Sequence, residues 1–230
     1  MVELKERVEE ILGRVGAAAS RSGRAASDIT LVAVSKTKPL EMIISAAQTG
    51  LVSHFGENRV QEGQEKIPAF PAEMSACWHL IGHLQRNKAR KALELFDIIE
   101  SLDSQELAAA CERICSETDR HMDVLIEVNS SKEASKTGAP MESAPALLEF
   151  ALKECPHLSV QGLMTVGPLG GGEKAVRQAF ASVRALRSSL EASYGIALPV
   201  LSMGMSGDFE WAIEEGSTEV RIGSSIFGHR

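Results

Sequence analysis

The part of the sequence with the densest pattern of chemically useful residues is 201–228, LSMGMSGDFEWAIEEGSTEVRIGSSIFG. The pattern predicts a strand end, a helix start at SGD (206–208), a short helix closed by Gly216, and a strand over 219–222. A second turn, GSS (223–225), follows that strand. Turns and helix starts of this kind offer backbone N–H groups and hydroxyls, which are good phosphate ligands. We therefore expect an anion site at these two turns.

Lys36 is the side chain best placed for covalent chemistry. It follows the apolar run ITLVAVS (29–35), and strand alternation places it on the same face as Val34. If that face lines a barrel, partial burial would lower the pKa of the amine and let it attack an aldehyde. A lysine Schiff base beside a phosphate cradle is what pyridoxal phosphate (PLP) requires. The alternatives are a lysine paired with Glu57 or Asp103, and a plain phosphate contact.

Arg221 ends the last predicted strand and would face the same mouth. It can donate a hydrogen bond to a pyridine nitrogen but will not supply a proton, because guanidinium stays charged at ordinary pH. The cofactor would then remain a weak electron sink. The alternative for Arg221 is a buried ion pair with Glu219 or Glu210. Lys38 shares the strand parity of Lys36 and is an alternative to it, although its place in the following loop favours a solvated amine.

Short apolar runs alternate with amphipathic stretches along the whole chain. Such alternation predicts parallel strands joined by helices, and eight units favour a single (β/α)8 TIM barrel over residues 1–230, with an additional N-terminal helix. A doubly wound sheet is the alternative, but the turn after the first strand lacks the expected glycines. The strand ends suggest one polar mouth on an apolar barrel. The predicted strands are 29–35, 52–55, 78–81, 98–102, 124–128, 158–164, 198–201 and 219–222.

Composition limits the function classes. The net charge of -7 implies no general affinity for nucleic acid or acidic membranes. No apolar run approaches the roughly 20 residues of a transmembrane helix, and the charged N-terminal helix is not a signal peptide. The four cysteines lack a paired framework, which is typical of free thiols in a reducing cytoplasm. We therefore expect a cytoplasmic protein.

Metal binding is not expected from the spacing of the histidines and cysteines. Cys111 and Cys115 lie one helical turn apart, but no second pair of ligands is evident. His79 and His83 straddle a strand end, so they do not share a helix face, and no third ligand is in view.

Seven motifs together resemble the pyridoxal phosphate homeostasis protein family, also called the YggS/PROSC family, whose barrel is similar to the N-terminal domain of alanine racemase. The resemblance covers nearly the whole chain. The motifs are LVAVSKTKP (31–39), HFGENRVQE (54–62), WHLIGHLQRNK (78–88), IESLDS (99–104), IEVNSSKEASKTG (126–138), GLMTVGP (162–168) and the 201–228 stretch.

The resemblance implies a role for each matching residue. Ser224 departs from the family, which commonly has threonine there, but the hydroxyl is kept. A second PLP site at Lys136 is left open. Carried over by motif, Lys36 is the Schiff-base lysine, Asn58 lines the cofactor face, Met203 lies near the pocket wall, Ser206, Gly223 and Ser224 hold the phosphate, and Arg221 faces the pyridine nitrogen.

The function implied by the resemblance is intracellular PLP (vitamin B6) homeostasis, in which the protein buffers PLP or delivers it to PLP-dependent apoenzymes without evident turnover.

The main alternative is a PLP-dependent amino-acid racemase, which needs a second base. In alanine racemase that base is a tyrosine from the partner's C-terminal β-domain. We expect that domain to be absent here, which also favours a monomer, and Tyr194 precedes the seventh strand at the wrong end of the barrel. His79 or a cysteine could still serve as the base. A third possibility is a cofactor-independent enzyme acting on a phosphorylated metabolite.

Overall fold

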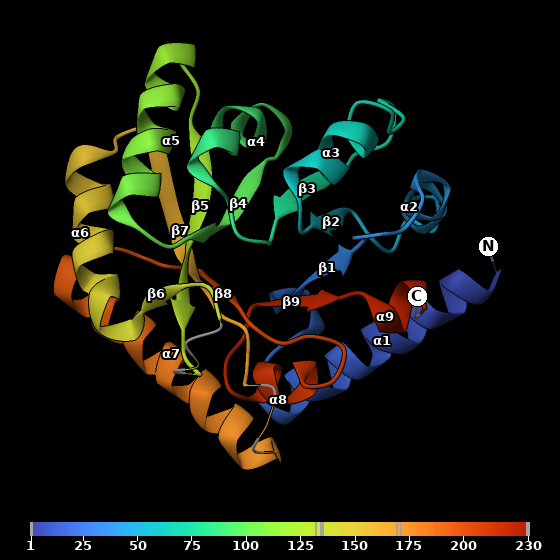
Figure 1. Cartoon of the computed structure of the whole chain (residues 1–230). Coiled ribbons are helices and arrows are strands. Elements are labelled where there is room, and N and C mark those ends of the chain that lie inside the picture. The colour runs from blue at the N-terminus through green and yellow to red at the C-terminus, as the bar shows by residue number, and fades with distance from the viewer. Residues whose placement is uncertain (1, 132, 134–135, 169, 171, 229–230) are drawn as a thin grey trace.

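A closed barrel of eight parallel strands forms the centre of the computed structural model (Figure 1), which describes residues 2–131, 133, 136–168, 170 and 172–228. Each strand pairs in parallel with its neighbour, and Thr30 opposite Glu219 closes the ring between the first and last strands. The predicted (β/α)8 barrel is therefore confirmed. Its strands are β1 (Thr30–Val34), β2 (His54–Glu57), β3 (Cys77–Leu80), β4 (Ile98–Leu102), β5 (Met122–Asn129), β7 (Leu158–Met164), β8 (Val200–Ser202) and β9 (Glu219–Ile222).

Helices surround the barrel and cover its outer, apolar face (Figure 1). Short 3-10 turns also occur at Ala26–Asp28, Arg86–Lys88 and Met141–Ser143. Among the described residues, no helix is both long enough and apolar enough to cross a membrane. The helices are α1 (Val2–Arg21), α2 (Leu40–Ala47), α3 (Val60–Lys66), α4 (Ala89–Leu95), α5 (Gln105–Thr118), α6 (Ala144–Glu154), α7 (Gly172–Tyr194), α8 (Phe209–Glu214) and α9 (Ser224–Phe227).

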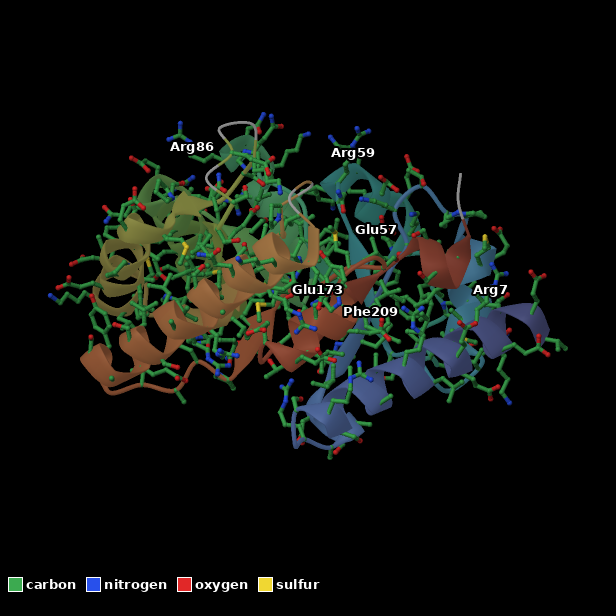
Figure 2. The ribbon with its side chains drawn as sticks, turned by 90° about the horizontal axis from the view of Figure 1, so that it is seen from below. Arg7, Glu57, Arg59, Arg86, Glu173 and Phe209 are labelled. Carbon is green, nitrogen blue, oxygen red and sulfur yellow. The ribbon has the colours of Figure 1, made fainter. Side chains whose placement is uncertain are left out.

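The additional N-terminal helix α1 packs against α8 and α9. Its stripe of Val8, Ile11 and Val15 is buried, as expected for apolar residues at helical spacing. Arg14 lies 4.7 Å from the centre of the Phe209 ring and pairs with the Glu210 carboxylate at 3.1 Å. Figure 2 shows Phe209 at the junction of α8 and α1. The helix thus braces the segment that carries one of the two predicted anion-binding turns.

Some element boundaries differ from the prediction. β2 begins at His54 and not at residue 52, and the turn predicted at 223–225 opens the one-turn helix α9. A two-residue strand, β6 (Ala139–Pro140), pairs with the end of β5 and was not predicted. An apolar run does not by itself show where ladder hydrogen bonding begins, so such ends are set by pairing with neighbouring strands.

The barrel interior is more polar than predicted. Inward-facing His79, Glu100, Ser202 and Arg221 are all at most 3% exposed. They form a hydrogen-bonded chain through the barrel, so the polar groups are not confined to its mouth. Paired polar groups can occupy a buried site because their partners replace the lost water.

Candidate functional site

A cavity of about 550 Å³ opens at the carboxyl-terminal ends of the strands. It brings together six of the seven residues that the sequence assigned to the cofactor site, all except Met203. The lining consists of Val34, Lys36, Asn58, Ile81, Val166, Met205, Ser206, Gly207, Arg221, Gly223 and Ser224. The lining residues come from both ends of the chain. They meet because β1 and β9 are neighbours in the closed barrel.

Lys36 lies at the rim of this cavity. β1 ends at Val34, and the chain then turns through Thr37, whose φ is +63°. The Lys36 side chain is consequently exposed, whereas we expected partial burial. The geometry of the turn explains the difference, because it carries residue 36 past the end of the strand into the open mouth.

Lys66 holds the loop that carries Lys36. Its buried amine donates hydrogen bonds to the Ser35 carbonyl at 3.0 Å, to Glu57 Oε1 at 2.7 Å and to Glu62 Oε2 at 3.2 Å. Glu62 Oε2 also accepts the backbone N–H of Thr37 at 2.6 Å. Both sides of residue 36 are therefore anchored to one ion network. Sequence reasoning missed this network, although Glu62 and Lys66 stand four residues apart in one helix, the spacing of an ion pair.

Burial and hydrogen bonding shift the pKa values of both carboxylates in this network. Burial raises the pKa of Glu57, against the lowering effect of the Lys66 and Ser35 hydrogen bonds. Burial also acts to raise the pKa of Glu62, but hydrogen bonds from Thr37 and Lys66 outweigh it, and the pKa is lowered. Among the described residues, Glu57 pairs with Lys66, and the alternative ion pair between Glu57 and Lys36 is not observed.

The anion-binding turns meet the cavity from two sides. Ser206 and Gly207 precede α8, where Asp208 Oδ1 accepts the Met205 N–H at 2.6 Å and fixes the turn. Gly223 and Ser224 begin α9 on the other side. A Cβ at Gly223 would lie 3.1 Å from the Val34 carbonyl oxygen, closer than most real contacts. Glycine therefore lets the β9 turn approach β1 and the base of the cavity.

Arg221 is 3% exposed and is held by three groups inside the barrel. Its guanidinium donates to Ser202 Oγ at 2.5 Å and to the Thr165 carbonyl at 2.8 Å. Glu100 Oε2 lies 3.8 Å away. The ion pair that we considered with Glu219 or Glu210 is thus made with Glu100 instead. Since five N–H groups are available on a guanidinium, others stay able to serve a ligand in the cavity.

Met203 is not among the residues that line this cavity. Met203 is fully buried in the hydrophobic core, and Met205 is the methionine that lines the cavity. The reason is strand alternation: Ser202 points into the barrel, so Met203 points outward to the helices. Gly204, with a φ of +101°, then turns the chain back. Asn58 does line the cavity, as expected, directly after β2.

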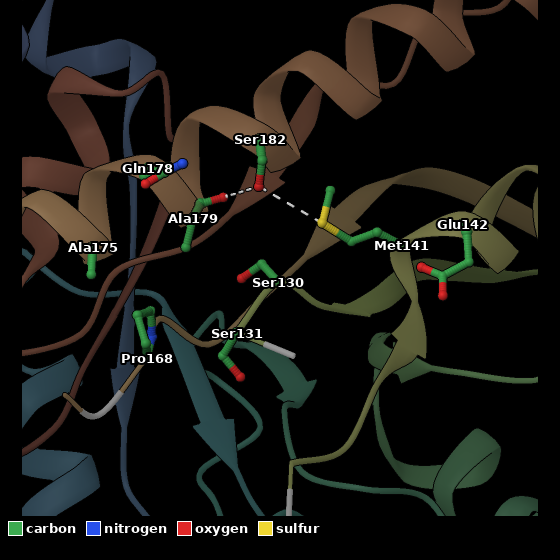
Figure 3. A pocket seen from close by; sticks show the side chains of 9 residues that line it. All are labelled: Ser130, Ser131, Met141, Glu142, Pro168, Ala175, Gln178, Ala179 and Ser182. Carbon is green, nitrogen blue, oxygen red and sulfur yellow. Dashed lines mark hydrogen bonds between the residues drawn. The ribbon is translucent and has the colours of Figure 1, made fainter. Parts of the chain in front are cut away.

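A second cavity of about 500 Å³ lies between the loop after β5 and helix α7 (Figure 3). In Figure 3, Ser182 donates to the Ala179 carbonyl at 2.7 Å and reaches Met141 Sδ at 3.7 Å. Its described lining includes the carboxylate of Glu142 and no cation. Lys136 donates to the Gly167 carbonyl at 2.6 Å and is outside this lining. These contacts give no support to a second phosphate site at Lys136; residues 132, 134 and 135 of the same loop lie outside the described residues.

Comparison with known proteins agrees with this architecture. Residues 17–230 match the family model described as alanine racemase, N-terminal domain. The chain is 42% identical over 225 residues to the pyridoxal phosphate homeostasis protein of Aquifex aeolicus, covering 98% of this chain and 97% of that protein. It is 40% identical over 233 residues to the protein of the same name from Vibrio cholerae, covering 100% and 98%. PipY from Synechococcus elongatus PCC7942, solved with PLP bound, is 35% identical with a TM-score of 0.84, covering 98% of this chain and 100% of PipY.

The barrel and its mouth thus define a protein of the alanine racemase N-terminal-domain class. Within that class, the chain belongs to the pyridoxal phosphate homeostasis protein family.

Proposed function

We propose that this protein binds pyridoxal 5'-phosphate in the cavity at the carboxyl-terminal mouth, as a Schiff base on Lys36, and buffers or delivers it without catalytic turnover. The observation that carries the proposal is the cavity itself. Among the described residues, its lining combines two cationic side chains, two serine hydroxyls and two glycines with no carboxylate. Such a lining suits an anionic aldehyde.

The residues present fit the group in three separate ways. The exposed Lys36 amine can reach an aldehyde without displacing any core residue. Ser206 and Ser224 can each donate a hydroxyl hydrogen bond to a phosphate at the base of the two turns. The absence of a side chain at Gly223 lets this turn lie close against Val34, where a Cβ would come within 3.1 Å of the carbonyl oxygen. When bound, PLP supplies an aldehyde for imine formation and a ring that can accept electrons.

The position of Arg221 favours a role in binding the cofactor over a role in catalysis. Its guanidinium would donate a hydrogen bond to the ring nitrogen but keep its own proton, because an arginine guanidinium stays charged in proteins. A ring nitrogen without a proton makes a weaker electron sink. The Glu100 and Ser202 contacts fix the guanidinium in that role.

The racemase alternative lacks a tyrosine base in this site. Tyr194, the sole tyrosine of the sequence, ends α7, and its hydroxyl donates to the Pro145 carbonyl at 3.0 Å. It is not among the residues that line the cavity.

We propose a cytoplasmic monomer that passes PLP to PLP-dependent apoenzymes through its open mouth. The four free cysteines are in keeping with a reducing compartment.

The test is the absorption spectrum of the protein with added PLP, before and after borohydride reduction, followed by peptide mapping. We expect a reducible yellow species and a modified peptide that contains Lys36. Binding without any reducible band would overturn the Schiff base.

Transfer is tested by mixing the loaded protein with a PLP-dependent apoenzyme and measuring recovery of the apoenzyme's activity. Turnover of D- or L-amino acids by the loaded protein would instead favour the racemase alternative.

A further inference from the structure

Three potential metal ligands converge at the opposite, amino-terminal end of the barrel. His54 is the first residue of β2, Cys77 is the first residue of β3, and the two residues are register partners. His79 follows Cys77 by two positions and therefore shares its face of the strand. One potential ligand atom from each of these three residues lies within 4.8 Å of the other two.

The separations of these atoms resemble those in a tetrahedral zinc site. Bonds of about 2.0–2.1 Å to nitrogen and about 2.3 Å to sulfur require edges of roughly 3.3 Å between nitrogens and roughly 3.5 Å between nitrogen and sulfur. Cys77 Sγ lies 3.5 Å from His79 Nε2. His54 Nδ1 lies 2.9 Å from the same nitrogen, so this pair needs to open by only a few tenths of an ångström.

A carboxylate behind His79 completes the arrangement that orients metal-binding histidines. His79 Nδ1 lies 2.7 Å from Glu100 Oε1, and both side chains are fully buried. Glu100 Oε2 accepts a hydrogen bond from Ser202 Oγ at 2.7 Å. A proton held on Nδ1 leaves the Nε2 lone pair directed toward His54 and Cys77. A carboxylate that accepts the other ring N–H of a metal-binding histidine is common in zinc sites and fixes the orientation of the ring.

The surroundings also favour a positive charge at this point. Glu219 is 5% exposed, and its Oε1 has no hydrogen-bond partner among the described residues. One Glu219 oxygen lies within 4.8 Å of both a His79 nitrogen and a Glu100 oxygen. Two buried carboxylates therefore flank His79, while Arg221 neutralises Glu100 from the far side. His54 and Cys77 are half-exposed, so an ion and a water ligand can enter from solvent.

We propose that His54, Cys77 and His79 bind one zinc ion at the amino-terminal end of the barrel, with water as the fourth ligand. The site is separate from the cofactor cavity, since none of its ligands lines that cavity. It does not depend on the proposed function. The hydrogen-bonded chain from His79 through Glu100 and Ser202 to Arg221 connects the two ends of the barrel.

The experiment uses the full-length protein freed of metal with a chelator and without added PLP. Zinc chloride is titrated against a chromophoric chelator, and cobalt(II) chloride is added in a parallel sample. We expect one equivalent of zinc per chain. Cobalt should give the visible bands of a tetrahedral complex and a near-ultraviolet thiolate-to-cobalt band. Less than one equivalent of zinc, or cobalt spectra without the thiolate band, would overturn the proposal.

Variants assign the ligands. Cys77→Ser should abolish the thiolate band. His54→Ala should weaken zinc binding by more than Glu100→Gln, which removes only the carboxylate behind His79 and should weaken it by about 10–100-fold. Both ligand changes are at half-exposed positions, and circular dichroism checks the fold. His83→Ala is the matched control, because His83 is exposed and hydrogen-bonded to Asp103. Equal zinc affinity in Cys77→Ser, His54→Ala and the control would contradict the assignment. Lys36→Ala should bind zinc like the wild type, which separates this test from that of the cofactor.

Discussion

The buried amine of Lys66 donates a hydrogen bond to the carbonyl of Ser35 at 3.0 Å, one residue before Lys36. The same amine binds Glu62, which accepts the N–H of Thr37 one residue after Lys36. One lysine therefore fixes the backbone on both sides of another. The Lys36 side chain is therefore exposed at the mouth, although the backbone on both sides of it is held by hydrogen bonds.

Lys66→Met should destabilise the protein by about 3 kcal/mol, because it leaves the buried Glu57 carboxylate without its cation. It should also slow imine formation with PLP, since the loop carrying Lys36 loses an anchor. Urea unfolding and the rate of the yellow band measure the two effects. Lys91→Met, at an exposed ion pair, is the control and should change stability by less than about 0.5 kcal/mol. Equal stability of the two variants would show that the network does not hold the loop.

Lys36→Ala should abolish borohydride-reducible attachment of PLP without unfolding the protein, because the side chain is exposed and packs into no core. Lys38→Ala should retain the attachment, as the Lys38 amine donates to the Gly228 carbonyl at 2.8 Å. Mass spectrometry after reduction distinguishes the two variants. A stoichiometric adduct on another lysine in Lys36→Ala would contradict the assignment.

Ser206→Ala and Ser224→Ala should each weaken PLP binding by about 1.5–3 kcal/mol, because each removes a hydrogen bond to a charged group. This corresponds to roughly 10–150-fold in Kd. Pyridoxal, which lacks the phosphate, should bind both variants as it binds the wild type. Ser225→Ala is the control, since Ser225 is next in sequence but does not line the cavity. A matching loss of pyridoxal affinity would indicate a distorted pocket and not a lost phosphate contact.

The buried thiols should be unreactive toward Ellman's reagent in the native protein at pH 8. Burial raises the pKa of Cys111 to about 12 and that of Cys155 to about 11. At pH 8 the thiolate fraction of Cys111 is then about 1 in 10,000, and the thiolate is the reactive form. The half-exposed Cys77 should react alone, and zinc should protect it. Reaction of two or more thiols before unfolding would contradict the packing of α5 and α6.

The same raised pKa values predict a pH effect on stability. Above the ordinary pKa of a thiol, about 8.5, the unfolded chain loses protons that buried Cys111 and Cys155 retain. Deprotonation then favours the unfolded state, so this contribution to stability is complete below about pH 8 and is lost as the pH rises through 11–12. Urea unfolding at pH 8 and pH 10 should show a smaller decrease for Cys111→Ala than for the wild type.

The sequence by itself determined the alternation of strands and helices, the two glycine-serine turns and the position of Lys36 after the first strand. These features are local: the period of apolar residues, the turn chemistry and the strand end are all readable within about ten residues. The closed barrel follows from repeating the same local unit eight times. Six of the seven cofactor residues that the family resemblance implies line one cavity, because strand ends and the turns after them meet at one mouth of such a barrel.

Tertiary structure alone decided which distant side chains meet. Glu100 contacts Ser202 across the barrel, and His54 meets His79 between neighbouring strands. No local period encodes these pairs, because they depend on strand register and on the closure of the barrel. Met203 is buried because it follows the inward-facing Ser202, and the turn at Gly204 then brings Met205 to the cavity. The sequence alone thus determined which residues lie at the mouth of the barrel. Only the tertiary structure placed a series of hydrogen-bonded polar side chains through its interior.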